Sequence, residues 1–347
     1  MKLNFCTLFN SGYLARGIAL YESLLNVCPD FHLYVFAFDD ASYNYLKSQS
    51  FEKLTVISLK EFEDTELLRV KPTRTAGEYC WTCTSSTILY CIEKFSLENC
   101  TYVDADMYFY INPSILVEEM KEKSVLITEH RYTKMYDQTE RSGKYCVQFI
   151  TIKNTTEGLE ILRWWRNACI DWCYARHEDG KFGDQKYLDD WMTRFTSVHE
   201  LQHLGGGIAP WNVQQYQFAS RNGNIVGKDM QSSANFEAVF FHYHGLKIFK
   251  DNVVRITEHG YEIDDIVKQL FFFPYIKRLV AIDTEIKASG CNINSNGAIE
   301  NSPYPVSKLK AAFRYYNHLI KSSKRNILGA KLLKNLRLHY YYDINKL

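Results

Sequence analysis

Two aspartates separated by one residue interrupt an apolar stretch of the sequence, in the segment Asp104-Ala105-Asp106. Side chains separated by one residue on an extended chain point the same way. Carboxylates among apolar residues are unfavourable unless something pairs with them. Oxygen ligands of this kind can hold Mg²⁺ or Mn²⁺ against a diphosphate. The alternative interpretation is a turn at a strand end with solvated acids.

A second polar cluster lies in His242-Tyr243-His244-Gly245-Leu246-Lys247. His242 and His244 share one face if the chain is extended, and either imidazole can complete a metal site built on carboxylates. Gly245 permits a close backbone approach, and Lys247 can meet a phosphate as a point charge. The alternative is a polar strand end with ordinary surface histidines.

A third candidate is Gly183-Asp184-Gln185. Asp184 and Gln185 can hydrogen-bond sugar hydroxyls and stabilise positive charge at an anomeric carbon. An aspartate after a glycine can also simply cap a helix.

Alternating strand and helix patterns must position these residues, and they predict an α/β fold with a parallel sheet. Apolar runs predict strands at Leu3–Phe9, Phe31–Phe38, Leu54–Leu59, Cys100–Val103, Ser124–Thr128, Val147–Ile152 and Val239–Tyr243. Helices are expected at Tyr13–Asn26, Tyr79–Phe95, Leu159–Tyr174 and Ile263–Ala288. Asp104 then follows a strand, at the edge where α/β sheets bind ligands.

Taken in this order and spacing, the three motifs resemble those of glycosyltransferase family 8. That retaining group has the GT-A fold and includes glycogenin and bacterial lipopolysaccharide galactosyl- and glucosyltransferases. The resemblance runs from residue 1 to about residue 250. It implies a Rossmann-like, mostly parallel sheet flanked by helices, followed here by a basic helical extension.

The resemblance also implies roles for individual residues. Its uridine-binding strand and turn correspond to Phe5–Tyr13, with nucleotide contacts from Thr7, Leu8, Asn10 and Tyr13. Its D-x-D motif matches Asp104, Ala105 and Asp106, and its H-Y-x-G motif makes His242 the third metal ligand, with His244 as the alternative and Gly245 and Lys247 near the phosphates. Its D-Q pair matches Asp184 and Gln185, next to the reacting carbon.

The chain departs from the family pattern at several positions. The family lysine is expected three residues after the glycine, where Ile248 stands, so Lys247 is one residue short. The family's N-x-G motif falls near Val147-Gln148-Phe149. Its arginine ahead of D-x-D has no clear match, since Glu78, Trp81 and Thr82 occupy that region. These departures bear on the donor sugar more than on the reaction class.

The resemblance predicts a metal-dependent, retaining glycosyltransferase that moves a hexose from a UDP-sugar to a saccharide, with Mn²⁺ or Mg²⁺ as the cofactor. One alternative is a non-catalytic scaffold that binds a nucleotide-sugar or a membrane. Another is a sugar nucleotidyltransferase, but its usual glycine-rich loop with basic residues is missing from Phe9–Tyr13.

Charge is distributed unevenly along the 347 residues, although the net formal charge is only +1. The predicted divisions are a catalytic domain at 1–260, a helix and linker at 261–304 and a basic tail at 305–347. The tail carries ten lysines and arginines and one acid, Asp343. A basic amphipathic helix there would bind an anionic membrane surface and approach a lipid-linked lipopolysaccharide or capsule acceptor. A packed terminal helix pair with a solvated basic face is the alternative.

Composition excludes several classes of protein. Neither the net charge nor a recognition module indicates a nucleic-acid partner. No run of about 18 apolar residues occurs, and the start MKLNFCTLFN does not resemble a secretory signal. The ten cysteines fall mostly at apolar positions, and Cys80 and Cys83 share a helix face. We therefore expect a cytoplasmic protein associated peripherally with the inner face of the membrane.

Overall fold

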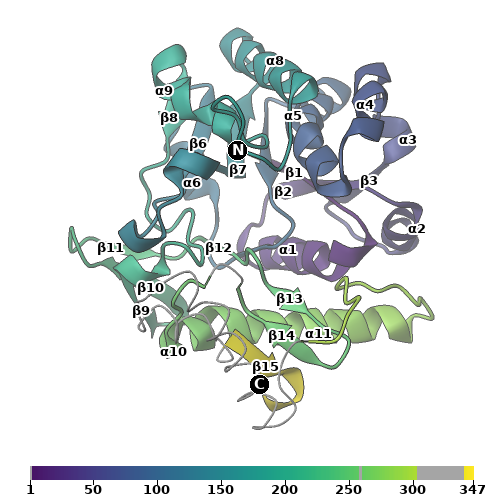
Figure 1. Cartoon of the computed structure of the whole chain (residues 1–347), viewed down its shortest axis with the longest axis vertical. Coiled ribbons are helices and arrows are strands. Elements are labelled where there is room, and N and C mark those ends of the chain that lie inside the picture. The colour runs from purple at the N-terminus through teal and green to yellow at the C-terminus, as the bar shows by residue number, and fades with distance from the viewer. Residues whose placement is uncertain (1, 258–259, 303–339) are drawn as a thin grey trace, which may run out of the picture.

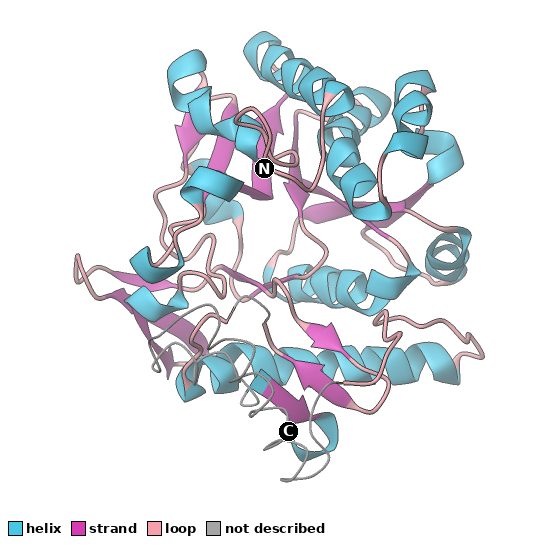
Figure 2. Cartoon of the chain, viewed as in Figure 1, coloured by secondary structure: helices cyan, strands magenta, loops and turns pink. Residues whose placement is uncertain are grey.

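A seven-stranded sheet forms the centre of the molecule (Figures 1 and 2). The computed structural model describes residues 2–257, 260–302 and 340–347. The strand order is β3-β2-β1-β4-β7-β6-β8, and β7 alone runs antiparallel to its neighbours. The strands are β1 (Leu3–Phe9), β2 (Phe31–Ala37), β3 (Leu54–Ser58), β4 (Asn99–Val103), β6 (Val125–Glu129), β7 (Tyr145–Lys153) and β8 (Val198–Glu200).

Helices cover both faces of the sheet. Alternate side chains of each strand point to opposite faces, so each face packs against helices in a core of its own. Leu3 and Phe5 of β1 join the core that contains α1 (Leu14–Val27) and α11 (Phe273–Ala288). Cys6 and Leu8 join the core of α5 (Ala76–Phe95) and α8 (Thr156–Asp171). The shorter helices are α2 (Asp40–Ser48), α3 (Leu59–Phe62), α4 (Thr65–Val70), α6 (Ser114–Glu118), α7 (Thr139–Ser142), α9 (Trp191–Arg194) and α10 (Asp265–Val267).

Helix α5 starts where its sequence supplies a capping box. The Thr75 side chain accepts the Glu78 backbone N–H at 3.3 Å, and the Glu78 carboxylate accepts the Thr75 N–H at 2.8 Å. Two backbone donors at the helix start are thereby satisfied. This start places Cys80 and Cys83 within α5, as predicted, and Cys83 is buried.

Three small sheets complete the fold around the central one. They are formed by β5 (Met107–Phe109) with β12 (Phe240–His242), by β9 (Tyr216–Arg221), β10 (Asn224–Asp229) and β11 (Asn235–Glu237), and by β13 (Lys247–Ile248), β14 (Val253–Arg255) and β15 (Tyr341–Asp343). Strands β9 and β10 have no counterpart among the predicted strands. Asn222 and Gly223 both have positive φ in the two-residue turn between them, which is the geometry that Asn-Gly favours.

The predicted fold class is confirmed as a mostly parallel α/β sheet flanked by helices. The helix expected over Ile263–Ala288 is instead α10, a π-helical turn at Lys268–Phe272 and α11. Buried residues of this segment share a core with β1 and α1, and Arg278 on α11 pairs with Glu22 on α1 at 2.7 Å. The two boundaries between the three predicted divisions stay predictions, and most of the basic tail lies outside the described residues. Within the described ranges, no helix is both long and apolar enough to cross a bilayer.

Candidate active site

A cavity of about 610 Å³ opens at the edge of the central sheet where β1 and β4 end and β7 begins. Leu8, Phe9, Asn10 and Tyr13 line it from the end of β1 and the following turn, and Asp104 to Asp106 line it after β4. Because parallel strands place their carboxyl ends at one edge, residues about 100 positions apart in the sequence meet here.

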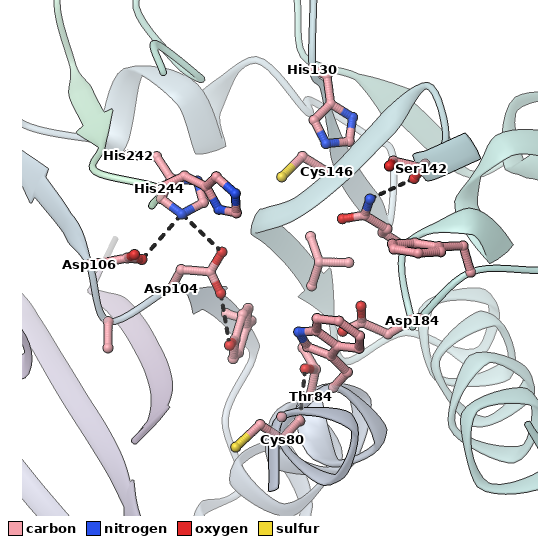
Figure 3. A pocket seen from close by; sticks show the side chains of 18 of the residues that line it. Cys80, Thr84, Asp104, Asp106, His130, Ser142, Cys146, Asp184, His242 and His244 are labelled. Carbon is pink, nitrogen blue, oxygen red and sulfur yellow. Dashed lines mark hydrogen bonds and ion pairs between the residues drawn. The ribbon is translucent and has the colours of Figure 1, made fainter. Parts of the chain in front are cut away.

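His242 lies beside the two aspartates because two short strands pair (Figure 3). Asp104-Ala105-Asp106 forms a turn, with the Met107 N–H donating to the Asp104 carbonyl at 3.2 Å, and is not the extended chain that the spacing suggested. The chain then enters β5, where Met107 stands opposite His242 of β12. His242 Nε2 lies 3.1 Å from Asp106 Oδ1 and 3.7 Å from Asp104 Oδ2.

Gln148 fixes the orientation of His242. Its Oε1 lies 2.7 Å from His242 Nδ1, so Nδ1 carries the proton and donates it to the amide oxygen. This leaves Nε2 facing the carboxylates. Gln148 is fully buried on β7, within the stretch that the sequence aligned with the family's N-x-G motif.

Charges in this cluster are strongly coupled. Burial would raise the pKa of Asp106, but the adjacent His242 charge lowers it to about 2. Burial raises the pKa of Asp104. Burial would lower the pKa of His242, yet Asp106 next to it holds that pKa well above its ordinary value. The protonated form of His242 is therefore favoured beside Asp106.

The three side chains fit a divalent metal ion. One ligand atom from each of Asp104, Asp106 and His242 lies within 4.8 Å of the others. Two carboxylate oxygens and one imidazole nitrogen are a donor set that Mn²⁺ accepts and that Mg²⁺ tolerates. His244 lines the same cavity, with its ring centroid 5.7 Å from that of His242.

Arg16 supplies a buried positive charge that the sequence analysis missed. It is 2% exposed, and its Nη2 donates to the Leu246 carbonyl at 3.0 Å, so it ties α1 to the loop after His242. Its guanidinium lies 4.5 Å from the Tyr13 ring centroid. Its charge also helps to lower the pKa of Asp106, after the larger effects named above.

Asp184 and Gln185 line the same cavity from another segment of the chain. Asp184 is buried, and burial raises its pKa to about 7, with a smaller contribution from the charge of Asp104. Gln185 Nε2 donates to the Ser142 carbonyl at 2.5 Å, which leaves Oε1 as an acceptor. Gly183 ahead of them has φ +54° and is packed near Trp81, so the turn requires glycine.

Not every residue predicted to bind the nucleotide lies at the cavity. Leu8, Ala105, Asn10 and Tyr13 line it. Three others fall outside its lining. Thr7 is buried in β1, Gly245 has φ +77° in the turn before β13, and the Lys247 ammonium lies 2.6 Å from Glu300. Lys247 would have to leave that carboxylate to reach a phosphate.

Several cavity residues had no signal in the sequence. The His130 ring stacks on Tyr132, with centroids 4.5 Å apart and planes 11° from parallel. Trp211 Nε1 donates to the His130 carbonyl at 2.8 Å, and the Trp211 ring is edge-on to both His242 and His130. Burial lowers the pKa of His130 to about 3, so this ring is neutral. These contacts join segments about 80 residues apart, so local spacing does not reveal them.

No protein-family model matches the chain. Among curated proteins it is similar to uncharacterized protein YfnF of Bacillus subtilis (strain 168), with 30% identity over 263 residues that cover 74% of this chain and 85% of YfnF. It is also similar to uncharacterized protein YfnD of the same organism, with 27% identity over 290 residues that cover 82% of this chain and 91% of YfnD.

Solved structures that resemble this chain include three glycosyltransferases. Mouse xyloside xylosyltransferase 1 is 13% identical with a TM-score of 0.40, over 60% of this chain and 87% of its own. Galactosyltransferase LgtC is 10% identical with a TM-score of 0.41, over 60% of this chain and 76% of its own. GlyE of Streptococcus pneumoniae TIGR4 is 11% identical with a TM-score of 0.44, over 84% of this chain and 64% of its own.

Proposed function

The chain belongs to the family of Bacillus subtilis YfnF, and from this premise and the geometry of the cavity we propose that it is a metal-dependent glycosyltransferase. The proposed reaction transfers a hexose from a UDP-sugar to a saccharide acceptor. The observation that carries the proposal is one cavity that holds both the Asp104, Asp106 and His242 cluster and the Asp184–Gln185 pair.

Asp104, Asp106 and His242 would hold Mn²⁺ or Mg²⁺, and Gln148 would keep His242 Nε2 directed at it. A cation bound there acts as a Lewis acid that neutralises the charge developing on the UDP leaving group. Tyr13 and Asn10, at the end of β1, would contact the uridine, with the Tyr13 ring available for stacking. Tyr13 is 43% exposed, which suits a residue that packs against a ligand.

Asp184 and Gln185 would act on the sugar. As the bond from the anomeric carbon to the diphosphate breaks, positive charge develops on the sugar ring. Gln185 Oε1 and the Asp184 carboxylate, in its ionised form, stabilise that charge. The acceptor oxygen forms the new bond, and its proton passes to the departing phosphate oxygen. Retention of configuration follows from the resemblance to family 8.

Thermal unfolding with UDP, with and without Mn²⁺, tests the metal–diphosphate part of the proposal. A ligand at about 100 times its Kd adds about 2.7 kcal/mol of stability, which is a shift of a few degrees for a chain of this size. We expect a shift with UDP that requires Mn²⁺ and that Asp106→Asn abolishes. The control is Asp171→Asn, at the exposed end of α8.

Two outcomes would contradict the proposal. No shift with UDP would remove UDP as the donor nucleotide, and a shift with another nucleotide would replace it. A metal-dependent UDP shift without hydrolysis or transfer of any UDP-sugar would favour a non-catalytic nucleotide-binding scaffold.

We further propose that the basic segment at 305–347 binds an anionic membrane surface, beside a lipid-linked lipopolysaccharide or capsule acceptor. The support is its charge, since each lysine or arginine near an anionic leaflet contributes about 1 kcal/mol. Deleting the segment would also remove β15, which pairs with β14. The sharper test is glutamine at Lys321, Lys324 and Arg325, which should release the full chain from anionic vesicles. Retained binding would contradict the proposal.

A further inference from the structure

The cavity has an aromatic wall beside Asp184, made of Trp81 and Phe182. Trp81 comes from α5, and its ring centroid lies 6.2 Å from that of Phe182. Both side chains are partly exposed. Flat apolar surfaces of this size suit the C–H face of a sugar ring, and the adjacent Asp184 and Gln185 offer polar partners for its hydroxyls.

Arg141 stands against this wall. Its guanidinium carbon lies 5.8 Å from the Phe182 ring centroid, within the range of a cation–π contact. Of the described residues that line the cavity, Arg141 is the one lysine or arginine. The same cavity also contains the carboxylates of Asp104 and Asp106, so groups of both charge signs line it.

Two lysines near Arg141 form ion pairs with carboxylates, whereas the Arg141 guanidinium forms none with the described residues. Lys144 lies 2.6 Å from Glu200, and Lys186 lies 2.9 Å from Asp189. Within the described part of the chain, no ion pair or hydrogen bond involves the Arg141 guanidinium, and the side chain is exposed. Its N–H groups are therefore free to meet a ligand anion in two parallel hydrogen bonds.

The backbone that carries Arg141 is held in place by the proposed catalytic segment. Arg141 lies on the short helix α7, whose Ser142 carbonyl accepts the Gln185 amide at 2.5 Å. The Lys186 ammonium donates to the Thr139 carbonyl at 2.9 Å. Just before α7, the Gln138 amide donates to the Tyr261 hydroxyl at 2.9 Å. These hydrogen bonds hold the backbone of Arg141 in place close to Gln185, which is expected to contact the reacting sugar.

We infer that this end of the cavity binds a saccharide with an anionic substituent, a carboxylate or a phosphate on the sugar, which Arg141 pairs while Trp81 and Phe182 pack against the ring. The inference rests on the proposed glycosyltransferase function and narrows its substrate class. An anionic substituent is favoured beside Arg141, because this is the one lysine or arginine among the described residues that line the cavity.

Binding of matched charged and neutral sugars tests the inference. With UDP and Mn²⁺ saturating the full-length protein, methyl β-glucuronide and glucose 6-phosphate are titrated against methyl β-glucoside as acceptor analogues. In a second arm, UDP-glucuronate is compared with UDP-glucose as the donor. We expect at least one charged ligand to bind about tenfold more tightly than its neutral partner at low salt. The acceptor arm and the donor arm show which sugar carries the anion.

Arg141→Gln should remove this preference while leaving the affinity for UDP with Mn²⁺ unchanged, and Arg141→Lys should keep part of it. The control is Arg163→Gln on the exposed face of α8, where the arginine pairs with Glu93. An equal affinity for charged and neutral ligands in both arms, or a preference that survives Arg141→Gln, would overturn the inference. If UDP still binds normally in that case, the proposed function is not affected. Loss of UDP binding in the unmodified protein would instead overturn the proposed function.

Discussion

Gln148 is the residue on which the geometry of His242 depends, and it offers a clean test of the metal site. Gln148→Leu removes the acceptor for His242 Nδ1–H, so the ring and its Nε2 lose their fixed direction. Loss of such a partner typically weakens metal binding by about 10- to 100-fold. We expect that weakening in a titration of Mn²⁺ followed by thermal shift.

Leucine removes the Gln148 Nε2 donor, which has no partner among the described residues, but it leaves the buried His242 Nδ1–H without its acceptor. We therefore expect a loss of stability of no more than about 1–3 kcal/mol. Gln231→Leu, on the exposed turn after β10, controls for the added apolar side chain. Unchanged Mn²⁺ affinity in Gln148→Leu would show that His242 is not held in this way.

Asp184 predicts a pH dependence of stability whose sign follows from its burial. Its pKa rises from 3.8 to about 7 in the folded protein. Between these values the folded state keeps a proton that the unfolded state has lost, so stability falls as pH rises, by at most about 1.4 kcal/mol per pH unit. Asp184→Asn has no such loss.

We therefore expect the melting temperature of Asp184→Asn to exceed that of the unmodified protein by more at about pH 8 than at about pH 5, while sugar transfer falls. A difference in melting temperature that stays constant with pH would place the Asp184 carboxyl in a solvated setting. If the predicted pH dependence is observed, the ionised Asp184 carboxylate lowers the stability of the fold at neutral pH while it serves the reaction. Such a trade-off between stability and activity occurs at functional sites.

The site residues that sequence could identify are those whose signal is local. Asp104 and Asp106 interrupt an apolar run, and Asp184 follows a glycine, so type and spacing marked them. His130 and Trp211 were missed because their contacts form only after distant loops fold together. Lys247 was placed near the phosphates by its motif, yet its partner in the structure is Glu300, about 50 residues away.

At the scale of elements, close packing of α1 against β1 shapes the nucleotide end of the cavity. A Cβ at Gly17 in α1 would lie 2.2 Å from Cζ of Phe9, which lines the cavity. Gly17→Ala should therefore destabilise the fold by about 1–3 kcal/mol, measured by denaturant unfolding. Gly77→Ala is the matched control in α5, where a Cβ meets nothing within 4 Å, and alanine there should add up to about 1 kcal/mol. Equal effects of the two substitutions would contradict this packing argument.

Six of the seven strands of the central sheet were predicted from apolar runs, whereas β8 and the antiparallel direction of β7 were not. The apolar run Leu3–Phe9 is β1 to the residue, because an uninterrupted buried strand needs apolar side chains on both faces. β7 has an equally apolar sequence but runs antiparallel between β4 and β6, and side-chain pattern carries no sign of direction. The hairpin β9–β10 did carry a local sign, its Asn222-Gly223 turn.

At the scale of the whole molecule, the helical segment after residue 260 packs into the main core, although the sequence analysis had predicted a division there. Phe271 is fully buried and packs edge-on against Phe218 and Tyr110. All six tryptophans lie between residues 81 and 211, so their fluorescence reports on the other half of the chain. Coupling between the two regions can therefore be measured.

Phe271→Ala should remove about 3–5 kcal/mol from the free energy of unfolding, since a large buried ring leaves a cavity. If the segment belongs to one cooperative core, the tryptophan fluorescence and far-UV circular dichroism transitions shift together to lower denaturant. Ile266→Ala is the control in α10, because Ile266 is 52% exposed and its loss should change stability by about 0.5 kcal/mol or less. A shift seen by circular dichroism alone would show that residues after 260 unfold independently, and the predicted boundary would then be a domain boundary.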